Sequence, residues 1–427
     1  MNLENMKNKI INLPVILFFI ILINYIPLII PNMISKESHG VDVIPMVICF
    51  GIECILLVFY FFKKIEITKE MKKNIVILSL VSIVLLIIQI KNFIIKKYEI
   101  MDVFNIGCQF INILLLFIAI LNMKSEEKYI FYFMNAMIML GIFACINNMI
   151  LYFDEILQTL GLQKGAFMVN IKSFFANRNQ FAFFMYVAII ADLFMVLKEN
   201  KLIHKALLLL FFVNLFFTMS RTGILAVGIF VFIYFLLTDK LNKKTKFILF
   251  VLGIICLVGM VYVINEVNPT LIQKLVRFER IKDLSGRTDI WARGINLLKE
   301  SPINMFFGVG RFQGTELLKF EKKSFSQFHN IYIDSLITGG IMELLFILYI
   351  YAVVIKNVLK SDIDRKYKNL YLAMFITFAI YICFESFGRF SIGCSDTLCL
   401  IFFVTIPLLH ANTCKTKDKL EVEGEQK

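Results

Sequence analysis

Several familiar catalytic motifs are missing from this sequence of 427 residues. It has no Walker loop, no GxGxxG unit and no HExxH motif, so neither nucleotide hydrolysis nor zinc chemistry has support. The one DxD triplet, at 362–364, lies beside lysines between two apolar runs, and we interpret it as solvated charge. We therefore expect a reaction that uses neither a metal nor a cofactor.

Cysteine pairs are missing as well. The nine cysteines are scattered, mostly inside apolar runs, and none forms a CxxC pair. Small buried hydrophobic side chains explain them better than disulfides or zinc ligands do. Charged residues make up only 18% of the chain, yet the net charge is +13. Lysine-rich cytoplasmic loops account for this excess better than nucleic-acid binding does, so we expect no nucleic acid partner.

What the chain has in abundance is apolar sequence, at 59% of its residues. The runs reach the roughly 20 residues that a membrane helix needs, and they are too long and continuous for barrel strands. This predicts an all-α polytopic membrane protein with about twelve transmembrane helices, at 10–30, 41–62, 74–90, 100–121, 129–153, 180–197, 203–220, 222–238, 247–264, 328–356, 370–387 and 391–410.

The positions of lysine and arginine favour an orientation with both termini in the cytoplasm. Lys91, Lys96 and Lys97 argue against it, because they fall in an outer loop. The chain then divides into helices one to nine (1–264), a large extracytoplasmic loop carrying short helices (265–327), helices ten to twelve (328–410) and a cytoplasmic tail (411–427).

The arginines are distributed unevenly across the expected membrane. Eight of the nine fall on the outer side, namely Arg178, Arg221, Arg277, Arg280, Arg287, Arg293, Arg311 and Arg389. Because a guanidinium group binds phosphate oxygens in a bidentate manner, this predicts a phosphate or diphosphate ligand there. The alternatives are plain loop charges that pair with lipid headgroups and, for Arg389, a helical i,i+4 pair with Glu385.

The outer loop contains an expected amphipathic helix at 289–300. One of its faces would carry Ile290, Trp291, Gly294, Ile295 and Leu298. We expect this helix to lie on the membrane and to roof a cavity, with the single tryptophan at the interface. Pro302 would end it, and Gly308 and Gly310 would form a tight turn before Arg311.

His329 opens the tenth expected span. A histidine at the water–lipid boundary can accept a proton from a sugar hydroxyl, although a capping or interfacial role would explain it too. Asn330 and Asp334 share a helix face with each other and would orient the substrate or the histidine. Glu343 lies inside the span, where an ionisable group is a functional candidate or pairs with a neighbouring helix.

Five motifs within about 165–345 resemble the O-antigen ligase and polymerase superfamily, the bacterial membrane glycosyltransferases of the Wzy and WaaL type. They are FFANRNQFA at 174–182, TMSRTG at 218–223, SGRTDIW at 285–291, PINMFFGVGRF at 302–312, and HN at 329–330 followed by Gly340. Two departures are a slightly long interval between Pro302 and Gly308, and Glu343 where the family often has glycine.

This resemblance implies a GT-C-like fold and a donor glycan linked to undecaprenyl diphosphate. It also implies inversion at the anomeric carbon, with no nucleotide sugar. Arg221, Arg287 and Arg311 would hold the diphosphate, and His329 would activate the acceptor hydroxyl. The catalytic candidates are thus His329, Arg287 and Arg221, and the substrate-binding candidates are Arg311, Arg178, Asn179, Asn330, Arg293, Arg389 and Asp334.

The resulting hypothesis is a repeat-unit polymerase for O-antigen, capsule or exopolysaccharide in the bacterial plasma membrane. Its active site would be on the outer face, and its partners would include a chain-length regulator and a flippase. The alternatives are an O-antigen ligase that transfers glycan to lipid A core, a polysaccharide flippase or transporter, and a non-catalytic scaffold. Transporters usually show internal repeats and broken helices around a midplane site.

Overall fold

The computed structural model describes residues 13–37, 126–160, 171–238, 287–310, 327–388 and 394–413. It also describes two short strands and some isolated residues between these ranges. The helices are α2 (Leu13–Asn32), α6 (Glu127–Leu151), α7 (Phe153–Thr159), α8 (Arg178–Glu199), α9 (Leu202–Phe217), α10 (Arg221–Leu237), α13 (Arg287–Lys299), α14 (Pro302–Phe307), α16 (Ile331–Lys360), α17 (Arg365–Tyr381) and α18 (Cys394–Cys399). The π-helix η3 (Leu400–Thr405) continues α18, and the strands β1 (Lys319–Phe320) and β2 (Lys323–Ser324) form a small antiparallel hairpin.

Apart from that hairpin, the described residues confirm the expected all-helical class. Five helical stretches are long and apolar enough to cross a membrane: Leu13–Asn32, Glu127–Leu151, Arg178–Glu199, Ile331–Lys360 and Ser395–Thr413. The apolar helices α9 and α10 are shorter. The expected spans 41–62, 74–90, 100–121 and 247–264 lie largely outside the described residues, so the count of twelve stays a prediction.

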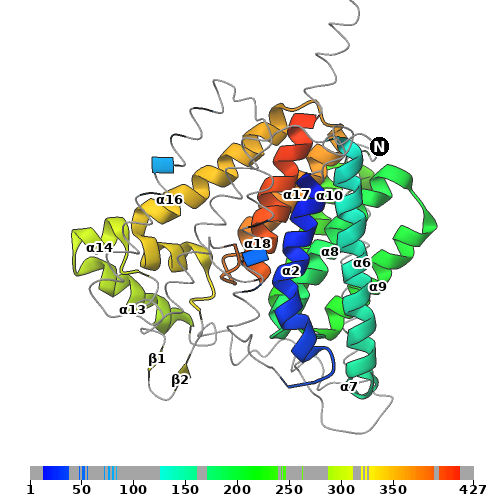
Figure 1. The fold of residues 1–427 in the computed structure, drawn as a ribbon, viewed down its shortest axis with the longest axis horizontal. Coiled ribbons are helices and arrows are strands. Elements are labelled where there is room, and N and C mark those ends of the chain that lie inside the picture. Colours follow the sequence, from blue (N-terminus) through cyan, green and yellow to red (C-terminus); the bar gives the residue numbers. More distant parts are fainter. Residues whose placement is uncertain are drawn as a thin grey trace, which may run out of the picture.

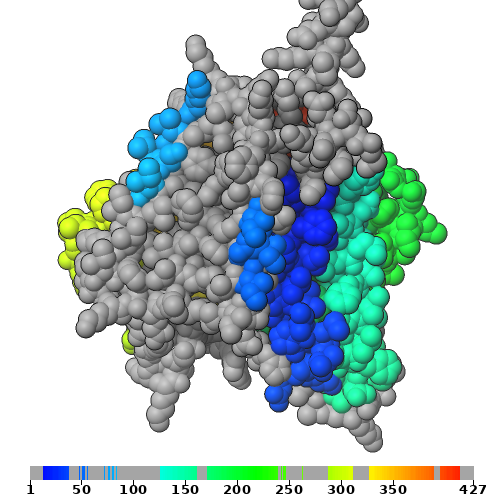
Figure 2. Space-filling model, viewed as in Figure 1, coloured from blue at the N-terminus to red at the C-terminus, as the bar shows by residue number. Residues whose placement is uncertain are grey.

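Most of these helices lie side by side in a bundle (Figure 1). The helix α8 is at its centre, with 78% of its most apolar window buried. Aromatic rings fill the core, and the rings of Phe378 and Phe403 stack with their centroids 4.0 Å apart. The space-filling view shows α2 and α6 running alongside each other on one face (Figure 2).

The helix α16 stands beside this bundle, with α13, α14 and the hairpin gathered near its first half (Figure 1). It is not the continuous span expected at 328–356, because Gly340 breaks it with φ 70° and ψ −165°. The break frees the carbonyl groups of Ile337 and Thr338, which accept hydrogen bonds from Val309 N and Gly310 N, each at 2.9 Å. A buried backbone carbonyl needs such a partner, so the 308–310 turn completes the broken helix.

Gly308 and Gly340 make this contact possible. Both have φ near +70°, and a Cβ on Gly308 would lie 2.4 Å from the carbonyl oxygen of Thr338. The turn expected at Gly308 and Gly310 is therefore confirmed. The helix ends before Pro302 as expected, since α13 stops at Lys299 and Ser301 is extended, and Pro302 also opens the next helix, α14.

The chain alternates in direction, so many helix termini meet at one end of the bundle. There α2, α6, α9 and α17 end, and α8, α10 and α16 begin. Asn147 of α6 donates to Met33 O just beyond α2, and Ser173 donates to Ala144 O of α6. We call this end, where Arg178, Arg221 and Ile331 begin their helices, the site end.

Candidate functional site

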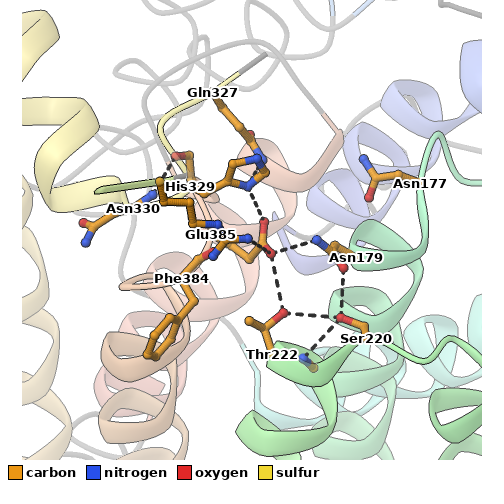
Figure 3. Close-up of polar contacts among 12 residues, drawn as sticks. Asn177, Asn179, Ser220, Thr222, Gln327, His329, Asn330, Phe384 and Glu385 are labelled. Atoms are coloured by element: carbon orange, nitrogen blue, oxygen red, sulfur yellow. Dashed lines mark hydrogen bonds and ion pairs between the residues drawn. The ribbon is translucent and has the colours of Figure 1, made fainter. Parts of the chain in front are cut away.

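A buried carboxylate, Glu385, is the centre of a polar cluster at the site end (Figure 3). Glu385 has none of its surface exposed, and it lies in the segment between α17 and α18. Its Oε1 accepts from Asn179 Nδ2 at 2.8 Å and from Thr222 Oγ1 at 3.4 Å. Its Oε2 lies 3.3 Å from His329 Nδ1, and its Oε1 lies 3.7 Å from Arg287 Nη2. Segments distant in sequence thus meet on one carboxylate.

Local capping places these partners. Asn177 caps α8 by accepting from Gln180 N, which puts Asn179 in the first turn. Ser220 caps α10 by accepting from Gly223 N, which places Thr222 in the first turn of that helix. Such side chains are favoured caps because they satisfy amide groups that have no helical partner.

The two capping regions are also joined to each other. Ser220 Oγ donates to Asn179 Oδ1 at 3.0 Å and lies 3.3 Å from Thr222 Oγ1. With its oxygen engaged by Ser220, the Asn179 amide turns its Nδ2 toward Glu385. The orientation of this amide therefore follows from α10 as well as from α8.

His329 immediately precedes the residue that caps α16. Its φ of 54° is in the left-handed region, which a histidine adopts only when its surroundings hold it there. Asn330 is the cap, since its Oδ1 accepts from Tyr332 N and Ile333 N. The side chain of His329 is 22% exposed, so it stays reachable while it contacts the buried Glu385.

The contact with Glu385 determines how His329 carries its proton. When Glu385 is ionised it can only accept hydrogen bonds, and the contact then requires the tautomer with the proton on Nδ1. Gln327 Nε2 lies at the same 3.3 Å from Nδ1, and the charged carboxylate is the stronger partner. The Nε2 lone pair of His329 is then the one able to accept a proton.

Arg287 begins α13 and connects that helix to the segment holding Glu385. Its Nη1 donates to Phe384 O at 2.8 Å, and its side chain is 19% exposed. Burial lowers the pKa of the Arg287 guanidinium, and the charge of Glu385 offsets this in part. Some of its five donors are thus engaged with the protein, and the expected contact with diphosphate stays a prediction.

The other residues expected in the site fall into three groups. Arg178 and Arg221 are the first residues of α8 and α10, partly exposed and next to Asn179 and Thr222. Arg293 lies on the exposed side of α13, and Asp334 is buried in α16. The remaining two, Arg311 and Arg389, lie outside the described residues.

Sequence reasoning missed the central role of Glu385. A helical i,i+4 pair with Arg389 was one alternative for this residue, and a helical pair is wrong because α17 ends at Tyr381, before Glu385. A carboxylate at the end of an apolar run was the available signal. Asn179 was named only as a substrate-binding candidate and Thr222 was not named, because each is an ordinary polar residue near a helix start that gives no sign of its contact with Glu385.

Other buried charged side chains have structural partners. Glu343 accepts from Thr338 Oγ1 at 3.2 Å, across the break in its own helix. Asp192 contacts His204 at 2.6 Å, and Asp396 accepts from Gly388 N at 2.8 Å. Within the described part of the chain, no three His, Cys, Asp or Glu side chains gather as metal ligands. A reaction without a metal stays a prediction.

The amphipathic helix expected at 289–300 is confirmed as α13, which begins two residues earlier. Its buried residues are Ile290, Gly294 and Leu298, and they pack in one cluster with Phe328 and Ile337. A Cβ on Gly294 would lie 2.0 Å from Ile337 Cδ1, so the glycine permits the close approach. The buried part of the apolar face therefore rests on α16, and the position of α13 at the membrane stays a prediction.

A family model described as O-antigen ligase matches residues 206–348. Over this segment, the chain is similar to the O-antigen ligase family. The match confirms the resemblance to the O-antigen ligase and polymerase superfamily, whose members are membrane glycosyltransferases acting on lipid-linked glycans. No curated protein matches the chain. The matched segment includes Thr222, Arg287 and His329, whereas Asn179 and Glu385 lie on either side of it.

Proposed function

We propose that this protein is a repeat-unit polymerase of surface polysaccharide, which transfers a glycan from undecaprenyl diphosphate to a lipid-linked acceptor. The observation that carries the proposal is the contact between His329 and the buried Glu385 at the site end. A partly exposed imidazole backed by a carboxylate is suited to take a proton from a hydroxyl group. The O-antigen ligase domain supplies the substrate class.

In this mechanism the acceptor hydroxyl donates its proton to His329 Nε2 as its oxygen attacks the anomeric carbon of the donor. Glu385 stabilises the imidazolium that forms and keeps the Nδ1 proton in place. The bond between the anomeric carbon and the diphosphate oxygen breaks, and undecaprenyl diphosphate leaves with the electron pair. Attack from the face opposite the leaving group inverts the anomeric carbon. The imidazolium then releases its proton to solvent, and no metal takes part.

Positive charge around this pair would hold the diphosphate. Arg178 and Arg221 stand at the first positions of α8 and α10, and both are partly exposed. A guanidinium group at a helix N-terminus combines bidentate donors with the partial positive charge of the helix. Arg311 and Arg389 complete the proposed set, and the leaving group departs more easily because its charge is stabilised.

The orientation is also part of the proposal: the site end faces outward, both termini are cytoplasmic, and the spans form a GT-C-like bundle. The positions of lysine support it, because Lys128, Lys198 and Lys205 lie at the ends of α6, α8 and α9 that are opposite the site end. A chain-length regulator and a flippase are the proposed partners. If cysteines placed at the start of α8 and α16 were labelled only from the cytoplasm, the orientation would be wrong.

Purified protein in nanodiscs with undecaprenyl-diphosphate-linked repeat units tests the function. We expect products longer than one repeat, released undecaprenyl diphosphate, and loss of both in His329→Ala. Transfer to added lipid A core, without chain growth, would identify a ligase. Movement of the lipid-linked unit across the bilayer without either product would identify a flippase.

A further inference from the structure

The structure contains a second arrangement around the catalytic pair, made by α13. Arg287 donates to the carbonyl oxygen of Phe384, which immediately precedes Glu385. Trp291 Nε1 donates at 2.8 Å to the carbonyl oxygen of Phe328, which immediately precedes His329. One helix therefore binds the backbone next to each member of the pair.

The spacing of the two donors matches this arrangement. Arg287 and Trp291 are four positions apart, so they lie on the same side of α13 and about 6 Å apart along it. The helix is itself held firmly, since Ile290 and Leu298 are buried against Phe328 and Ile337. Both donors thus belong to a rigid element with fixed separation.

The two segments that α13 holds are also bonded to each other. Asn330 N donates to Ser386 Oγ at 3.1 Å, which joins the residue after His329 to the residue after Glu385. Ile331 N donates to Ile382 O at 2.9 Å. Together with the contacts from α13, these bonds fix the backbone on both sides of His329, where the left-handed φ of 54° needs such support.

We propose that α13 is a two-point clamp, in which Arg287 and Trp291 are positioning residues that align His329 with Glu385. This inference rests on the proposed function, because it assigns the alignment to a transfer reaction. Through the clamp, a displacement of α13 changes the geometry of the catalytic pair. A ligand that contacts α13 therefore affects the reaction without contact to His329.

Trp291→Phe tests the clamp, because phenylalanine keeps an aromatic ring in the partly buried position and removes only the N–H donor. We expect kcat to fall about 5- to 10-fold, as for the loss of one hydrogen bond, while KM stays within about twofold. Asn296→Ala, which changes an exposed residue of the same helix, is the control and should keep both constants. Equal kcat values for Trp291→Phe and wild type would overturn the clamp.

Two further measurements separate the clamp from the transfer reaction. The combined variant Trp291→Phe/Arg287→Lys should lose less than the product of the two single losses, because both changes release the same alignment. The rate at which diethyl pyrocarbonate modifies His329, followed by mass spectrometry, needs no turnover. We expect Trp291→Phe to change that rate at least threefold, and an unchanged rate would contradict the clamp. A changed rate in a protein without transferase activity would refute the proposed function alone.

Discussion

The two ends of the bundle each hold a histidine in contact with a buried carboxylate, and the two pairs differ in their surroundings. At the opposite end, His204 Nδ1 lies 2.6 Å from Asp192, and the side chains are 9% and 0% exposed. Asp192 Oδ2 has no hydrogen-bond partner. At the site end the histidine is 22% exposed, and Glu385 is bonded through both oxygens.

This difference shows that a histidine–carboxylate pair is not by itself a catalytic site. Reactivity requires a free nitrogen that a substrate reaches and a carboxylate whose position is fixed. Asn179 and Thr222 fix Glu385 from α8 and α10, whereas Asp192 is positioned by its contact with His204 alone among the bonds described. The buried pair instead joins α8 to α9, which is a structural task.

The largest expected effect on turnover comes from replacing His329, and replacing His204 is the matched comparison. His329→Ala should lower turnover about 1,000-fold, since a general base contributes about 100- to 10,000-fold. His204→Asn should keep turnover per folded molecule within about twofold and lower the melting temperature. Turnover in nanodiscs and thermal unfolding in detergent measure both quantities. An equal loss of turnover in the two variants would remove the distinction between the pairs.

Replacing each carboxylate by the amide of the same size removes its charge alone and allows a finer comparison. Glu385→Gln should lower kcat about 100-fold, because a neutral amide no longer stabilises the imidazolium or fixes the Nδ1 proton. Asp192→Asn should affect stability alone. The amount of folded protein, from size-exclusion chromatography, serves as the control. Full activity of Glu385→Gln would show that charge at this position is not needed.

A smaller effect is expected for the amide that holds Glu385. Asn179→Ala removes the 2.8 Å bond to Glu385 and should lower kcat about 10-fold with little change in KM. Asn148→Ala is the matched variant, because Asn148 donates a 3.0 Å bond to Asn214 away from the catalytic pair. We expect that variant to lose stability and to retain kcat. The reverse result would mean that Asn179 is structural.

The smallest expected effect on turnover comes from Tyr371→Phe. Tyr371 OH of α17 lies 3.0 Å from His410 Nδ1 in the buried core. His410 is on the last described helical stretch, Ser395–Thr413. Losing this bond should cost about 1 kcal/mol of stability and lower the melting temperature by about 1 °C. Turnover at 25 °C should equal that of the wild type. A clear fall in turnover would indicate that the opposite end takes part in the reaction.

Long continuous apolar runs were enough to predict the helices, because each membrane-length helix satisfies its own backbone. The eight expected spans that fall on described residues all coincide with helices, and α13 was expected within a few residues. The break at Gly340 was not predicted, because its freed carbonyls are satisfied by the distant 308–310 turn. Hydropathy carries no information about such a contact.

His329, Asn179 and Arg287 were named from the sequence because their residue types and motifs favour phosphate binding or proton transfer. How they meet was beyond the sequence. Asn179 and Glu385 are separated by 206 positions, and nothing in either segment indicates the other. Trp291 was assigned to the membrane interface, whereas its indole N–H binds the carbonyl group next to His329.

The sequence by itself determined the class of molecule, the helices and the chemical types available to the site, because hydrophobicity, helix caps and side-chain chemistry are local properties. Only the tertiary structure decided that Glu385 is the centre of the polar cluster, that α13 rests on α16, and which of the histidines is reachable. These depend on which helix ends come together. Packing between residues as far apart in the sequence as Asn179 and Glu385 decides which ends meet, and it sets both the burial and the hydrogen-bond partners of each residue.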